Sequence, residues 1–229
     1  MKNALVLALA VTLAAAACSK KSQATAVDLQ TEDQKTLYAL GLVMSENLNP
    51  FGLNEAEVEI VKAGFTDGAL KRTRQVDLSI YGPKLRDLAQ ARSTAGAATE
   101  KASGGEFLSK AALEKGAVKA PAGFVIQEIK AGTGPSPKQT DTVKVHYRGT
   151  LTDGTVFDSS IDRGEPAVFP LANVIPCWSQ GVQMMKVGGK SRLVCPPELA
   201  YGDRGAPPHI KPGATLNFEV ELLEIVKKP

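Results

Sequence analysis

Several residue types are scarce in this chain of 229 residues, and their scarcity argues against whole classes of function. There are only two histidines, and His146 and His209 share no ligand spacing with any cysteine, so we expect no metal site. The formal net charge is only +3, with basic and acidic residues interspersed, which argues against nucleic acid as a partner. Residues 187–191 end like a phosphate-binding loop, but Met184 stands where that motif needs glycine. We therefore expect no cofactor.

The apolar run at residues 4–17 is shorter than the roughly 20 residues that a membrane-spanning helix needs. Its position predicts a secretory signal over residues 1–17. Cys18 ends the run in a pattern that resembles a bacterial lipoprotein box, and Ser19 is typical of outer-membrane sorting. We expect a lipidated Cys18 and an outer-membrane lipoprotein of the cell envelope, facing the periplasm or the surface, with membrane contact through the lipid anchor alone. The alternative is a plain signal peptide cut after the alanines at 15–17.

Cysteine is equally scarce, because only Cys177 and Cys195 follow the signal. In an oxidising compartment the two could form a disulfide, whereas in the cytosol such a pair would usually be two small buried side chains. Sequence alone does not supply the separation of their Cα atoms, so both interpretations stay open.

The N-terminal third is helical in pattern. Residues 18–29 are polar without periodicity and predict a flexible tether. Residues 30–75 predict two short amphipathic helices, the first opened by the capping-box spacing of Thr31 and Gln34. These helices are too small to be stable alone, so they either pack on the C-terminal domain or pair with a second copy. The segment that follows favours a homodimer formed through these helices.

Residues 76–115 are alanine-rich and weakly apolar, which predicts a long connecting helix solvated on most sides. Pro83 and the pair at 104–105 are expected kinks. Phe107 and Leu108 supply an apolar face for docking near the end of the helix.

Residues 116–229 change to strand periodicity. Residues 142–151 alternate apolar and polar side chains, and Asp153-Gly154 is a strong hairpin signal. A short helix is expected at 179–186, with further strands at 124–129, 191–195 and 215–226. The fold class is therefore α+β: a C-terminal antiparallel half-barrel sheet with one short helix, preceded by an all-α dimerisation domain and a long connecting helix.

Six of the twelve aromatic residues lie between Tyr147 and Phe218, around the only tryptophan, Trp178. Taken singly, such residues are more often core than pocket. Asp158, before two serines, could simply form a turn, and the tyrosine hydroxyls could be satisfied internally.

Several segments together resemble the FK506-binding-protein type of peptidyl-prolyl isomerase. They are VKVHYRG (143–149), GTVFDSS (154–160), VIPCW (174–178), LAYG (199–202) and LNFEVEL (216–222), in the order that the family has them. The helical part ahead of them resembles the N-terminal domain of the macrophage infectivity potentiator group, whose members are dimers joined through two short helices.

The resemblance implies which residues form the site. Catalytic roles fall to Tyr147, Phe157, Asp158, Tyr201 and Phe218, and substrate binding falls to Phe169, Val174, Ile175, Trp178 and Ile210. Asp158 would orient the substrate through hydrogen bonds, and residues 205–210 would form a flap over the proline. Ala167 stands where relatives often have a second aromatic residue, which thins one wall and bears on the affinity for macrolides.

The implied function is a prolyl isomerase with chaperone action on exported proteins. Its partners would be proline-containing polypeptide clients, a second copy of the chain, and macrolide inhibitors of the FK506 type. The alternative is a non-catalytic holdase chaperone that grips prolines in the same pocket. A purely structural envelope lipoprotein would not need such a set of aromatic residues.

Overall fold

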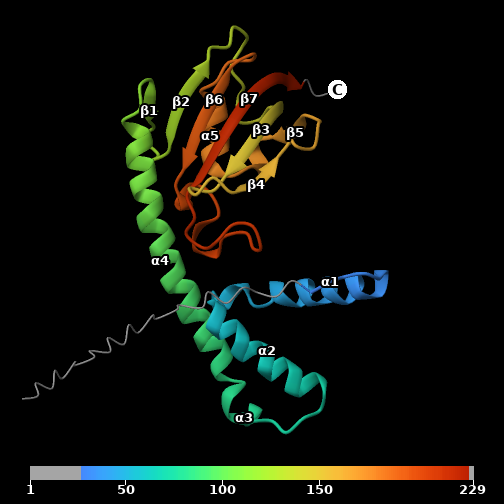
Figure 1. Ribbon diagram of the computed structural model, residues 1–229. Helices are drawn as coiled ribbons and strands as arrows, with labels where there is room; N and C mark the ends of the chain where they lie inside the picture. The colour runs from blue at the N-terminus through green and yellow to red at the C-terminus, as the bar shows by residue number, and fades with distance from the viewer. Residues whose placement is uncertain (1–26, 227–229) are drawn as a thin grey trace, which may run out of the picture. The chain divides into compact units, whose positions relative to one another are not determined.

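The computed structural model describes residues 27–226 (Figure 1). The expected signal at 1–17, Cys18, and the tether up to residue 26 lie outside the described residues. The chain divides into two units, residues 1–41 and 42–229. Helix α1 (Glu32–Glu46) crosses the boundary, and its start has the expected capping box: Gln34 N donates to Thr31 Oγ1 (3.2 Å), and Thr31 N donates to Gln34 Oε1 (2.9 Å).

The second helix is fixed to the connecting helix by an ion pair. After a short 3₁₀ turn, η1 (Asn49–Phe51), α2 (Glu55–Ala69) begins with Asn54 and Glu57 in a capping box. Arg92 binds both carboxylate oxygens of Glu57, at 2.6 and 3.0 Å, and also donates to the Phe51 carbonyl. Hydrogen bonding from Arg92, and then from the Asn54 backbone, lowers the pKa of Glu57 to about 2. α2 therefore keeps its place on α4 by a charged contact.

The connecting segment is not one continuous helix. It is split into α3 (Leu78–Tyr81) and α4 (Lys84–Ala112) at Gly82 and Pro83, and Pro83 is one of the expected kinks. At Gly104 the helix does not break, since α4 continues through it. A Cβ on Gly104 would lie 2.8 Å from Thr215 Cβ, so glycine permits close packing here. Most positions of α4 are exposed, and its buried residues are Ala97, Gly104 and Ala111.

Seven strands form one antiparallel sheet within residues 27–226. Their order is β1-β2-β6-β7-β3-β4, and Figure 1 shows the long β7 between β6 and β3. β5 pairs with the first four residues of β3, on the edge opposite β7. The strands are β1 (Ala117–Lys119), β2 (Val125–Lys130), β3 (Thr142–Thr150), β4 (Val156–Ser159), β5 (Ala167–Pro170), β6 (Lys190–Cys195) and β7 (Leu216–Val226). The expected antiparallel sheet with one short helix is confirmed, while β1 and β5 were not predicted.

The short helix α5 (Pro176–Gln183) begins three residues earlier than expected, because Pro176 suits the first turn of a helix. It therefore contains Trp178, and it buries Trp178, Cys177 and Val182 against the sheet. On the sheet side, Val143, Val145 and Tyr147 of β3 alternate inward as predicted. The core lies between α5 and the sheet.

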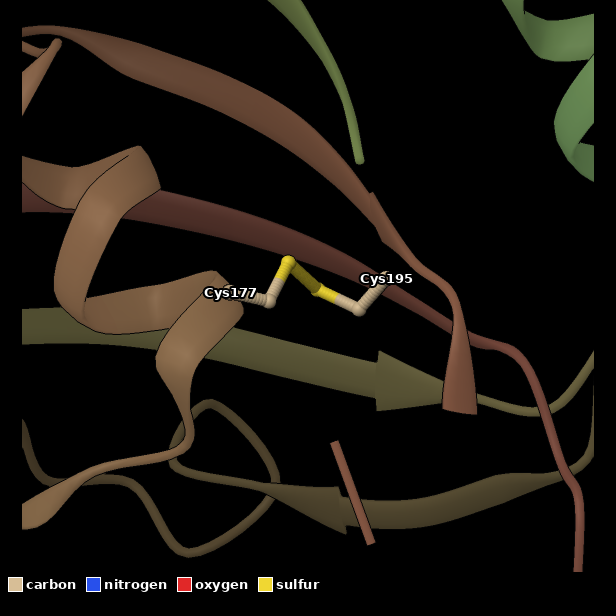
Figure 2. Close-up of a disulfide and its surroundings, with 2 residues drawn as sticks. All are labelled: Cys177 and Cys195. Carbon is tan, nitrogen blue, oxygen red and sulfur yellow. A yellow bond between two sulfur atoms is a disulfide. The ribbon is translucent and has the colours of Figure 1, made fainter. Parts of the chain in front are cut away.

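A disulfide joins α5 to the end of β6. Figure 2 shows Cys177 on the helix and Cys195 on the strand, with their sulfurs between the two elements. Their Cα atoms are 5.7 Å apart, and both side chains are fully buried. Among residues 27–226, no helix combines the length and the apolar character needed to cross a bilayer.

Candidate active site

Five aromatic rings meet between α5 and the sheet, and we call them the aromatic cluster. Trp178 stands at their centre, with ring centroids 5.2 Å from Tyr147, 5.3 Å from Phe218 and 5.8 Å from Phe169. Phe157 joins through Phe218 at 5.5 Å. All four of these pairs are edge-to-face, a favourable arrangement of ring quadrupoles. The cluster draws on β3, β4, β5, α5 and β7, so only the folded chain assembles it.

The cluster is buried at its base and partly open elsewhere. Tyr147, Trp178 and Phe218 are 4–5% exposed, whereas Phe157 and Phe169 are half-buried. Gly149 of β3 makes room for this arrangement, because a Cβ there would lie 2.6 Å from the Phe157 ring. The sequence interpretation did not single out Gly149, although a glycine inside a strand is a signal of close approach.

The candidate contact residues outside the cluster differ in position. Val174 and Ile175 are half-buried and pack on the same core, and Ile210 is part of it. Ile210 exchanges two backbone hydrogen bonds with Ala206, which closes the tip of the expected flap. Tyr201 is 43% exposed and is not among the side chains that pack on this core. Eight of the ten candidate residues therefore lie in or against one core, and a ninth, Asp158, is hydrogen-bonded to Tyr147 of that core. The tenth, Tyr201, lies at the margin.

Asp158 belongs to a hydrogen-bonded network with Tyr147 and Arg163, which we call the carboxylate network. The Tyr147 hydroxyl and an Arg163 guanidinium N–H each donate to the Asp158 carboxylate. Arg163 Nη2 also donates to the Tyr147 hydroxyl, at 3.0 Å. Arg163 was not among the residues expected from the sequence, because it reaches Asp158 only through the turn that follows β4. The network fixes the Tyr147 ring and a negative charge at the edge of the cluster.

The charges of this network follow from its contacts. Burial would raise the pKa of Asp158, but the hydrogen bonds from Tyr147 and Arg163 and the Arg163 charge outweigh it, so that pKa is lowered. Burial, followed by the hydrogen bond to Asp158, raises the pKa of Tyr147. The pKa of Arg163 is raised by its bonds to Tyr147 and Asp158. At neutral pH the network therefore holds a carboxylate, a neutral phenol and a guanidinium.

Trp178 carries a buried donor without a partner. Its indole Nε1 is the only buried side-chain polar atom in the described residues that lacks a hydrogen bond. An unpaired buried donor costs about 1–3 kcal/mol, so this N–H at the centre of the cluster suits a bound acceptor. Within the described chain, no group of three side chains could hold a metal ion.

A hollow of about 250 Å³ adjoins the site at Val174, but it is not formed by the aromatic cluster. Gln139, Ser179 and Gln183 are among its lining residues, together with the apolar Ala172 and Pro176. The chemistry we assign to the site rests on the ring contacts and the carboxylate network, and not on this hollow.

The sequence matches two protein-family models. Residues 134–223 match "FKBP-type peptidyl-prolyl cis-trans isomerase", and residues 33–127 match "Domain amino terminal to FKBP-type peptidyl-prolyl isomerase". Among curated proteins, the chain is 40% identical to the FKBP-type peptidyl-prolyl cis-trans isomerase FkpA of Aeromonas hydrophila, covering 93% of this chain and 83% of that one. It is 35% identical to the "Outer membrane protein MIP" of Legionella longbeachae, covering 99% of each.

Solved structures agree with these matches. The crystal structure of FkpA from Escherichia coli aligns with a TM-score of 0.67 at 40% identity, covering 88% of this chain and all of that one. A peptidyl-prolyl isomerase from Pseudomonas syringae aligns with a TM-score of 0.53 at 35% identity, covering 56% of this chain and 95% of that one. The likeness extends across both the helical region and the sheet.

Proposed function

The chain belongs to the FKBP-type peptidyl-prolyl cis-trans isomerase family, and we propose that it speeds the folding of exported proteins by isomerising prolyl bonds at the aromatic cluster. The observation that carries this assignment is the aromatic cluster around Trp178 with the carboxylate network at its edge. Both lie within the residues that match the isomerase model.

The reaction suits a site without a nucleophile. Rotation about an X–Pro bond loses amide resonance and must cross a barrier of roughly 18–20 kcal/mol. Water favours the planar, charge-separated amide, so an apolar surface that excludes water from the prolyl carbonyl favours the twisted transition state. The rings of Phe157, Phe169 and Phe218 supply that surface, with Trp178 as its floor.

Polar groups at the edge hold the substrate chain. Asp158 orients the substrate through its carboxylate, while Arg163 and Tyr147 keep that carboxylate in position. Tyr201 and the backbone N–H of Ile175 bind carbonyls of the substrate, and residues 205–210 cover the proline. Val174 and Ile210 extend the apolar contact. A macrolide of the FK506 type fills the same surface.

The helical region is proposed as a dimerisation domain over residues 30–75, with residues 76–115 as the arm and 116–229 as the isomerase domain. On α1, Leu37, Leu40 and Val43 are 66%, 55% and 62% exposed. On α2, Val58, Val61 and Phe65 share one face and are 38%, 36% and 55% exposed. A second copy that covers these side chains would remove a large apolar area from water. The same exposed side chains, on each helix taken by itself, support chaperone action on unfolded clients.

The cell envelope is the proposed location, with Cys18 as the lipidated anchor. The support is the signal-like run ending at Cys18 and the likeness over 99% of the chain to a protein named for the outer membrane. Because the chain would then fold in an oxidising compartment, the disulfide fits this location.

The function is tested by isomerisation of a short X–Pro peptide by the soluble chain, residues 19–229, with and without FK506. We expect catalysis that FK506 abolishes, with an unfolding transition at higher temperature when FK506 is bound. A folded chain that binds FK506 without catalysing isomerisation would replace the enzyme with the proline-binding holdase.

The dimer is tested by sedimentation of the same chain beside two variants of α2. Phe65→Glu places a carboxylate on the exposed apolar face, and Ala63→Glu places one on the opposite side of the helix. We expect a dimer for the parent chain and for Ala63→Glu, and a monomer for Phe65→Glu. A monomeric parent chain would contradict dimerisation through these helices.

A further inference from the structure

One face of α4 meets the loop that leads into β7. Ala97, Glu100, Lys101 and Gly104 recur at the spacing of a single helix face, and each contacts this loop. The loop, residues 202–215, begins directly after Tyr201 and contains Ile210, so it carries the proposed flap.

Two of the four contacts are close approaches at glycines. A Cβ on Gly213 would lie 2.5 Å from the Ala97 carbonyl oxygen, and one on Gly104 would meet the Thr215 side chain. Ala97, Gly104, Gly213 and Thr215 are all buried. Small residues on both sides therefore let the helix and the base of the loop touch directly, which leaves little freedom to shift one without the other.

The other two contacts are ion pairs. Lys101 Nζ lies 2.6 Å from Asp203 Oδ1, and Lys211 Nζ lies 3.1 Å from Glu100 Oε1. The two pairs run in opposite directions, since the helix contributes one cation and one anion. These two ion pairs favour one register of the loop along α4. If the loop shifted by one helical turn, both pairs of opposite charges would be separated.

The loop itself transmits this position to the site. Gly213 N donates to the Gly202 carbonyl at 3.0 Å, so the base of the loop is closed where α4 touches it. From that base the chain reaches Ile210, which is 5% exposed in the core that contains Trp178 and Phe218. A displacement of Gly213 or Asp203 therefore moves the segment between Tyr201 and Ile210.

We propose that α4 is a positioning element of the isomerase site, with Ala97 and Lys101 holding the loop 202–215 in the conformation that closes on the substrate. This inference rests on the proposed function, and it assigns the arm a role beyond connection. A hollow of about 310 Å³ between this part of α4 and Asp203 shows that the contact is local and not a continuous packed interface. The four contacts are therefore the ones to perturb.

The decisive variant is Ala97→Leu in the soluble chain 19–229, with Ala95→Leu as its control on an exposed position of the same helix. Extra bulk at Ala97 pushes the loop away from α4, so we expect the KM for a short X–Pro peptide to rise roughly tenfold, with kcat nearly unchanged. A loss of folded protein would instead lower apparent kcat and leave KM alone. Equal KM values for both variants and the parent chain would overturn the proposal.

Charge reversal supplies a second variant set that does not add bulk. Lys101→Glu and Asp203→Lys should each raise KM about two- to fivefold, as expected for a partly exposed pair, and the combined variant should restore it. A combined variant as impaired as the single ones, with normal folding, would remove Lys101 from the positioning role.

Hydrogen exchange separates this inference from the enzymatic assignment. The amides of Gly213 and Ile210 are hydrogen-bonded within the loop, so Ala97→Leu should speed their exchange about tenfold relative to Ala95→Leu. If the parent chain proved inactive, the proposed function would fail, while faster exchange would still show that α4 holds the loop. Unchanged exchange in Ala97→Leu would overturn the positioning role whatever the activity.

Discussion

Asp158→Ala is expected to lower kcat/KM for a prolyl peptide by roughly 30-fold, because it removes the acceptor shared by Tyr147 and Arg163. Hydrogen bonds to a charged group contribute about 2 kcal/mol, which corresponds to that factor in rate. The Tyr147 ring, at the base of the cluster, also loses the contact that fixes its hydroxyl. Activity is measured on the soluble chain with a short X–Pro peptide.

Asp162→Ala is the matched control for this variant. Asp162 is exposed, four residues further along, and outside the carboxylate network, so its removal should leave kcat/KM within about twofold. Full activity in Asp158→Ala, with a normal unfolding transition, would show that the carboxylate takes no part in the reaction.

The pH profile gives a second readout of the same group. Because the pKa of Asp158 is lowered in the folded chain, its carboxylate is ionised throughout the neutral range. Its contribution to stability is present above the unfolded pKa of about 4 and is lost as the pH falls through the lower folded value. We expect kcat/KM to stay level down to about pH 4.5. In Arg163→Ala the pKa of Asp158 rises, since burial remains while a donor and a charge are gone, so the decline should begin at higher pH.

Periodicity and turn chemistry were sufficient to predict most of the fold. The alternation in β3, the hairpin at Asp153-Gly154 and the capping box at Thr31 are local patterns, and each lies where it was expected. β1 and β5 were missed because strands of three and four residues carry too little pattern to stand out. The packing role of Gly104 was missed because a helical glycine indicates weakness unless its neighbour, Thr215, is known.

The candidate site could be predicted only in part, because its members come together from distant segments. The aromatic residues were found through the family resemblance of their local motifs, whereas spacing alone favoured a plain core. Arg163 lies outside those motifs and reaches Asp158 through a turn, and Gly149 matters only because two rings press against it. The contacts of α4 with the loop were also beyond reach, since they join residues more than 100 positions apart. The catalytic and binding roles of the ten residues stay predictions.

Removing the disulfide is expected to lower the free energy of unfolding of the isomerase domain by about 3 kcal/mol. The bond closes a sequence separation of 18 residues, and the figure follows from the entropy that such a loop takes from the unfolded chain. For a domain of this size, the same loss lowers the unfolding temperature by roughly 10–20 °C. The measurement is thermal and urea unfolding of the double variant Cys177→Ala/Cys195→Ala beside the parent chain.

Reductant distinguishes a lost bond from lost packing, because both side chains are also fully buried. In dithiothreitol the parent chain should unfold close to the double variant, while the variant itself should not respond to reductant. A parent chain that unfolds at the same urea concentration with and without dithiothreitol would mean that the cysteines are two buried thiols. Since Cys177 directly precedes Trp178 on α5, the bond also restrains the helix that positions the centre of the aromatic cluster. Reduction well below the unfolding temperature should therefore weaken FK506 binding before the domain unfolds.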